Sequence, residues 1–114
     1  MLFRSQFANY SDASLKTNVQ PLSGSLEKVL ALKPASYDWI ADKSHVTAGF
    51  IAQDVQQVYP EYVIENMANE GDEPLMGLTG GMTGGFIADL VKAIQEQQEI
   101  ITSLKSRIEA LENK

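Results

Sequence analysis

The sequence predicts a small α+β protein in which short strands and helices are followed by a long C-terminal helix. Strand-like and helix-like segments follow one another in residues 26–78 without a regular βαβ order, which indicates the mixed class. From about residue 85 onward, apolar side chains recur at alternating intervals of three and four residues. The chain has 114 residues, which suffice for one domain or for a small domain with a stalk.

The first part of the chain is predicted to be extended and then helical. Residues 11–22 are polar, and Pro21 disfavours the helical conformation in the residue before it. A short helix is predicted over residues 26–32, because a hydroxyl side chain at Ser23 or Ser25 can accept a hydrogen bond from its first free N–H groups.

A β-hairpin is predicted to follow. Residues 36–40 alternate between polar and apolar types, which is typical of a half-buried strand with Tyr37 and Trp39 on one face. Residues 45–51 have the character of the return strand. Both aromatic side chains are therefore expected in the core.

The segment between this hairpin and the long helix is predicted to hold one helix and two short strands. Residues 52–59 have helical spacing, and Pro60 ends it. Short strands are expected at residues 62–64 and 75–78, with the acidic loop 65–74 between them.

A glycine-rich segment, Thr-Gly-Gly-Met-Thr-Gly-Gly at residues 79–85, precedes the long helix. Such a loop before a helix can bind phosphate through its N–H groups. This one lacks the lysine that ends a P-loop and the spacing of a dinucleotide-binding loop. The simpler interpretation is a flexible hinge, with Thr83 as the helix cap.

The long helix carries the pattern of a parallel coiled coil. At about 1.5 Å per residue it would be too long to bury its apolar stripe against so small a domain, which favours self-association over folding back on its own chain. Gln97 at a core position, with Val91 and Ile100 beside the stripe, does not decide between a two-stranded and a three-stranded coiled coil, and both remain equally open. The heptad positions are Ile87, Leu90, Ile94, Gln97, Ile101, Leu104, Ile108 and Leu111.

Composition excludes several classes of site. The net charge of −6 disfavours a nucleic-acid partner, which would require a basic face. The absence of cysteine excludes disulfides and thiolate chemistry, and His45, the single histidine, cannot build a multi-histidine metal site. No apolar run is long enough to span a bilayer. We therefore expect a soluble protein without a metal, a cofactor or a membrane partner.

Ser11 and Lys16 are the candidate catalytic residues. A serine and a neutral lysine close together can form a nucleophilic dyad, in which the amine takes the hydroxyl proton. A lysine amine is ordinarily charged at neutral pH, so burial or a nearby positive charge would be needed to make it a base. The spacing alone is weak evidence, because Ser11 and Asp12 could equally be turn formers and Lys16 a solvated charge.

Several motifs occur in a specific order along the chain. They are Ser-Asp-x-x-Leu-Lys-x-Asn-Val at 11–19, Leu-Glu-Lys-Val-Leu-x-Leu-Lys-Pro at 26–34, Tyr-x-Trp at 37–39, Gly-Phe-Ile-Ala-Gln-Asp-Val-Gln at 49–56, Tyr-Pro-Glu at 59–61 and Leu-Val-x-Ala-Ile-x-Glu at 90–96. This succession resembles the C-terminal intramolecular chaperone domain of phage tailspikes, tail fibres and endosialidases, classed as peptidase family S74. The resemblance covers residues 11–111.

The resemblance implies a homotrimer with a parallel trimeric coiled coil, and so favours three strands over two. It implies an intramolecular chaperone that assists folding of the fibre segment upstream in the same chain, in the host cytoplasm during virion assembly. The chain would then divide into an upstream tail (1–10), a globular chaperone part (11–82) and a coiled-coil stalk (83–114).

The resemblance also implies a single-turnover serine peptidase that cuts its own chain at the Tyr10–Ser11 bond. Ser11 would be the nucleophile and Lys16 the general base, and cleavage should wait for a folded trimer that desolvates Lys16. Many relatives carry Arg where this chain has Ser14, so an ion pair that could orient Asp12 is absent here. The alternative is a trimerisation and folding module with the same fold that does not cleave.

Overall fold

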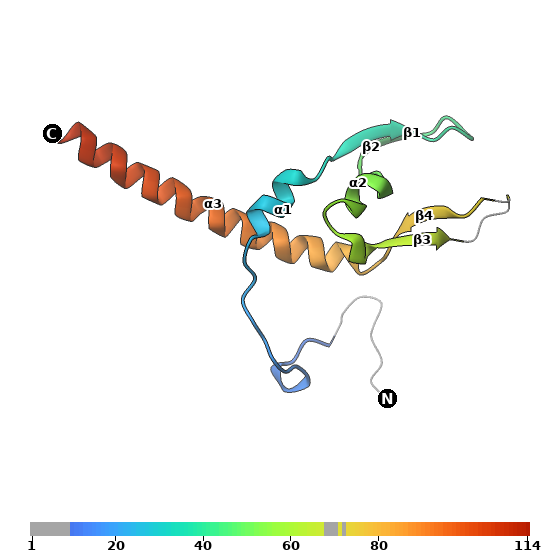
Figure 1. Cartoon of the computed structure of the whole chain (residues 1–114), viewed down its shortest axis with the longest axis horizontal. Coiled ribbons are helices and arrows are strands. Elements are labelled where there is room, and N and C mark those ends of the chain that lie inside the picture. The colour runs from blue at the N-terminus through green and yellow to red at the C-terminus, as the bar shows by residue number, and fades with distance from the viewer. Residues whose placement is uncertain (1–9, 68–70, 72) are drawn as a thin grey trace.

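The long helix predicted at the C-terminus dominates the structure, a computed structural model that describes residues 10–67, 71 and 73–114. Its α+β class, with short strands and one long C-terminal helix, confirms the predicted fold class. In chain order the elements are the 3-10 helix η1 (Ala13–Leu15), α1 (Ser25–Ala31), β1 (Ala35–Asp38), β2 (His45–Gly49), α2 (Ala52–Gln56), the 3-10 helix η2 (Pro60–Tyr62), β3 (Val63–Met67), β4 (Leu75–Leu78) and α3 (Met82–Glu112). Both hairpins project away from the N-terminal end of α3 (Figure 1).

Helix α1 packs against the middle of α3, and this pairing joins segments about 70 residues apart in the sequence. Neither predicted serine caps α1. The N-cap is Gly24, whose φ of 71° is in the left-handed region that glycine tolerates. Glu96 of α3 performs the capping instead, because its Oε1 accepts from the backbone N–H groups of Ser25 (2.8 Å) and Leu26 (3.1 Å).

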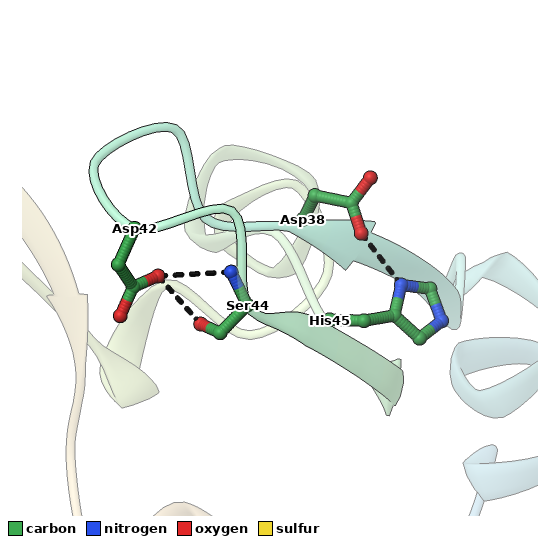
Figure 2. A network of polar contacts seen from close by, with 4 residues as sticks. All are labelled: Asp38, Asp42, Ser44 and His45. Atoms are coloured by element: carbon green, nitrogen blue, oxygen red, sulfur yellow. Dashed lines mark hydrogen bonds and ion pairs between the residues drawn. The ribbon is translucent and has the colours of Figure 1, made fainter.

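Strands β1 and β2 form the predicted antiparallel hairpin. Its turn is closed by side chains as well as by backbone: Asp42 Oδ1 accepts from the N–H (2.9 Å) and the hydroxyl (2.7 Å) of Ser44. At the base of the turn, Asp38 Oδ1 lies 2.6 Å from Nδ1 of His45 (Figure 2). The single histidine is thus an exposed partner of a carboxylate.

Strands β3 and β4 form a second antiparallel hairpin, with Val63 opposite Leu78. The prediction for β4 is confirmed residue for residue, whereas β3 begins one residue later than predicted and runs on to Met67. The predicted loop at 65–74 is therefore shorter, and its residues 68–70 and 72 lie outside the described residues. Helix α2 ends at Gln56, three residues before the predicted end at Tyr59, so Pro60 does not end it and instead opens η2.

The core is small and lies where α2, η2 and the first turns of α3 meet. Val55, Tyr59 and Phe86 are buried there, and half-buried residues such as Phe50 and Tyr62 pack around them. The rings of Tyr59 and Tyr62 stack with centroids 5.3 Å apart, and each ring also contacts that of Phe86.

The expectation that both hairpin aromatics are core residues was wrong for Trp39. Its side chain is 56% exposed, whereas Tyr37 is half-buried and meets the indole ring edge to face at 5.6 Å. Both side chains line an open groove of about 330 Å³ together with Phe50, Ile51, Ala52, Gln53, Met76, Gly77 and Leu78.

The predicted flexible hinge before α3 is mostly helix. The helix begins at Met82, so Thr83 lies inside it and Gly81 is the N-cap, which corrects the predicted cap. Gly85 is needed for close approach, since a Cβ there would overlap the Tyr62 hydroxyl and lie 2.5 Å from its Cζ. A Cβ at Gly84, one residue earlier, would meet nothing within 4 Å.

Candidate functional site

Ser11 and Lys16 are brought together within one chain. The amine Nζ of Lys16 donates to Oγ of Ser11 at 2.6 Å. A regular helix would not place residues five apart squarely on one face. Here a single 3-10 turn, η1, lies between them, and Lys16 is extended with φ −124° and ψ 150°, so its side chain reaches back to the serine.

The local sequence explains this turn. Asp12 is the N-cap of η1, and its Oδ1 accepts from the N–H (2.8 Å) and the hydroxyl (2.6 Å) of Ser14. Backbone bonds from Leu15 N–H to Asp12 O and from Lys16 N–H to Ala13 O complete it. The prediction of an extended segment over 11–22 missed η1; the signal for it was aspartate followed two residues later by serine, a turn-forming pair.

The electrostatics of the turn favour an ionised Asp12. The hydrogen bond from the Ser14 side chain lowers the pKa of Asp12, and the bond from the Ser14 backbone N–H lowers it further. Hydrogen bonds to a carboxylate stabilise its charged form. The two bonds to Asp12 therefore remain at neutral pH and would weaken only in acid, below the ordinary range of an aspartate.

The site is open to water in the single chain. Tyr10 is 57% exposed, and all residues from Ser11 to Gly24 are exposed. We name residues 10–24 the arm. Nothing in the described part of this chain removes water from the Lys16 amine. Of the predicted upstream tail (1–10), only Tyr10 lies within the described residues.

The arm is attached to the rest of the chain at a buried polar contact. Ser25, which follows the arm, is 1% exposed, and its hydroxyl donates to Oδ1 of Asp89 at 2.6 Å. Asp89 is itself buried in α3. Together with the Glu96 cap, this contact fixes the start of α1 on α3 and so fixes where the arm leaves the body.

Helix α3 has two distinct faces. Phe86, Asp89 and Ala93 are its buried residues and contact the rest of the chain. The predicted heptad positions lie elsewhere on the helix, and all of them are exposed, from 45% at Leu90 to 65% at Ile94 among the apolar ones. From Gln97 onward every residue is exposed, so the alternative of a helix folded back on its own chain is wrong.

Other site classes find no support in the described residues. Within them no group of three histidine, aspartate or glutamate side chains could hold a metal ion. In the same residues no helix is both long and apolar enough to cross a membrane.

Comparison with known proteins finds similar sequences over most of the chain. Residues 11–64 match the family model described as peptidase S74, chaperone of endosialidase. The long tail fibre protein Gp37 of Enterobacteria phage K3 is 33% identical over 108 residues, which cover 91% of this chain and 8% of that protein. Gp37 of Enterobacteria phage T2 is also 33% identical over 108 residues, covering 91% of this chain and 7% of its own length. The chain thus spans less than a tenth of these relatives.

Proposed function

Since the chain belongs to the peptidase S74 family, the chaperones of endosialidase, we propose that it is an intramolecular chaperone for a phage tail fibre. In this proposal three copies associate through the stalk and assist folding of the fibre segment upstream. The chaperone then releases itself by cutting its own chain between Tyr10 and Ser11.

The contact of 2.6 Å between Lys16 Nζ and Ser11 Oγ is the observation that carries the cleavage proposal. Once the Lys16 amine has lost a proton to solvent, it is placed to take the proton of the Ser11 hydroxyl. Oγ then forms a bond to the carbonyl carbon of Tyr10. The C–N bond between Tyr10 and Ser11 breaks, and the proton on Lys16 moves to the departing nitrogen, which leaves an ester between the two residues. Water hydrolyses the ester, so Tyr10 gains a carboxylate and Ser11 regains its hydroxyl beside a free amine.

Assembly is the proposed trigger for this reaction. In one protomer the Lys16 amine is exposed, and a charged amine donates a hydrogen bond but cannot accept a proton. A neighbouring protomer that covered the arm would remove water from Lys16 and favour its neutral form. Cleavage would then follow folding and association and would not precede them.

The exposed heptad residues support the proposed trimer. Seven of the eight positions are apolar, and a stripe of this length on a soluble protein indicates a binding surface. Half-exposed Val91 and Ile100 widen the stripe, which suits a third helix. The family resemblance favours three copies over two. We further propose the division into tail (1–10), chaperone part (11–82) and stalk (83–114), with α3 beginning at Met82.

Such a trimer would act on the fibre by proximity. Holding three chains together at one end raises the effective concentration of the neighbouring segments and so favours their correct register. Release after folding would make fibre assembly difficult to reverse, so the fibre would gain kinetic stability. These steps would take place in the host cytoplasm during virion assembly.

One observation favours a second candidate, a folding module with the same trimeric stalk that does not cleave. The dyad is exposed in the single chain, and a water-exposed lysine is a poor base.

The deciding experiment follows the intact mass of the protein over time, with a fibre segment fused before Met1. Wild type, Ser11→Ala and Lys16→Ala are compared with Ser23→Ala, an exposed serine of the same arm that serves as the matched control. We expect wild type and the control to break at Tyr10–Ser11 while the two dyad variants stay whole. If all four stay whole but sediment as trimers, the protease role is refuted and the folding module remains. Cleavage of Ser11→Ala at the same bond would refute the mechanism.

A further inference from the structure

The geometry points to Ser14 as a positioning residue for the Tyr10–Ser11 cleavage: its hydroxyl, through Asp12, holds the turn that keeps Lys16 against Ser11. This role rests on the proposed function, because it concerns the rate of that same reaction. Ser14 itself contacts neither Lys16 nor Ser11 by any hydrogen bond that the structure gives it.

Two bonds from Ser14 converge on one oxygen of Asp12. The backbone N–H at 2.8 Å would be present with almost any residue at this position. The hydroxyl at 2.6 Å is the part that only serine or threonine supplies. A hydrogen bond to an ionised acceptor is stronger than one between neutral groups, so the hydroxyl makes a substantial share of the contact that caps η1.

Local bonds have to hold this turn, because no buried surface does. Each residue of the segment from Ser11 to Lys16 is exposed, and the hydrogen bonds that the structure gives it all lie within the segment. Fixing the backbone of each residue is opposed by about 1–2 kcal/mol of conformational entropy. The fraction of time that Lys16 spends against Ser11 therefore depends on the few bonds that close η1.

The same arrangement occurs a second time in the chain, where it serves only a turn. Ser44 donates its N–H and its hydroxyl to Oδ1 of Asp42 in the β1–β2 hairpin (Figure 2). In both places the serine side chain is the first cause that lowers the pKa of the aspartate. The chain thus offers an internal control, since Ser44→Ala removes an equivalent bond at a distance from the dyad.

The test measures the cleavage rate of the assembled protein by intact mass for Ser14→Ala, Ser14→Thr, Ser44→Ala and Ser11→Ala. Removing the Ser14 hydroxyl should slow cleavage about fivefold to tenfold. Threonine keeps the hydroxyl and should restore the rate to within about twofold, and Ser44→Ala should cleave as wild type does. Thermal unfolding and sedimentation of Ser14→Ala should match those of the wild type, because Ser14 is exposed and lies outside the core.

The outcomes separate this inference from the proposed function. If Ser11→Ala stays whole while Ser14→Ala cleaves at the wild-type rate, the role of Ser14 is refuted and the function stands. Equal slowing by Ser14→Ala and Ser44→Ala would also refute it, since the effect would then be a general one on stability. If Ser14→Thr does not restore the cleavage rate, the hydroxyl is not the group through which this residue acts, and the role proposed for it is refuted. If Ser11→Ala cleaves, or the assembled wild type does not, the proposed cleavage mechanism and the role of Ser14 are both refuted.

Discussion

Replacing Gly85 with alanine tests whether the first turns of α3 owe their position to close packing against Tyr62. The added Cβ would overlap the Tyr62 hydroxyl and lie 2.5 Å from Cζ and 3.2 Å from Cε1. The ring cannot simply move away, because it stacks on Tyr59 at 5.3 Å and meets Phe86 at 5.5 Å. We expect the variant to be less stable than the wild type.

The size of the effect follows from two opposing terms. Alanine in place of glycine inside a helix stabilises the folded state by about 1 kcal/mol. Overpacking a well-packed site typically costs about 1–3 kcal/mol, and an overlap with both hydroxyl and ring belongs at the upper end. The net loss should therefore be about 2 kcal/mol. Gly84→Ala, with no atom near its Cβ, should instead gain about 1 kcal/mol, so the two variants should differ by about 3 kcal/mol.

The assay is denaturant unfolding followed by helical circular dichroism, at one protomer concentration for all variants. Because both glycines lie in the same turn of α3, the difference between them isolates the overlap with Tyr62. Tyr62→Leu in the Gly85→Ala background should recover part of the loss, since it removes the obstructing ring. If Gly85→Ala is as stable as Gly84→Ala, the packing argument is wrong.

Two further results are expected. Glu96→Gln should destabilise the protein by about 1 kcal/mol relative to Glu99→Gln, an exposed control on the same helix. The reason is that Glu96→Gln replaces the charged acceptor for two N–H groups of α1 with a neutral one. Equal stabilities of the two variants would exclude the capping role. Burial raises the pKa of Tyr59, and nearby Asp89 raises it further. Burial also raises the pKa of Tyr62. Unfolded tyrosines ionise near pH 10, so stability should be unaffected by these groups below about pH 10 and should fall as the pH rises above it. An absorbance titration that shows all tyrosines ionised near pH 10 in a protein with native circular dichroism would contradict this.

Local pattern was sufficient to predict most elements but not the contacts between distant segments. The short strand at residues 75–78 and the helical spacing after residue 85 depend only on neighbouring residues, and both predictions were close. The N-terminus of α1 depends on Glu96, about 70 residues away, so a search for a nearby capping serine could not find it. Gly85 was interpreted as flexible because the approach of Tyr62 is a tertiary contact.

The candidate site shows the same limit. The residue types made Ser11 and Lys16 candidates, but only the resemblance assigned them roles, because their spacing alone is common. What brings them together is the turn between Asp12 and Ser14, which is local and could have been predicted from the aspartate–serine pair. In the proposed trimer a neighbouring protomer would bury Lys16, and no pattern within one chain specifies that surface.

The two faces of α3 have a consequence for how the sequence can change. Contacts with the protein's own body involve Phe86, Asp89, Ala93 and Glu96, whereas every residue of the helix beyond Glu96 is exposed. Substitutions in the distal heptads should alter association while leaving the body as it is, and substitutions on the body face should do the reverse. Effects of such distant changes should add. Relatives could therefore exchange stalks of different length or strength without redesigning the domain that carries the arm.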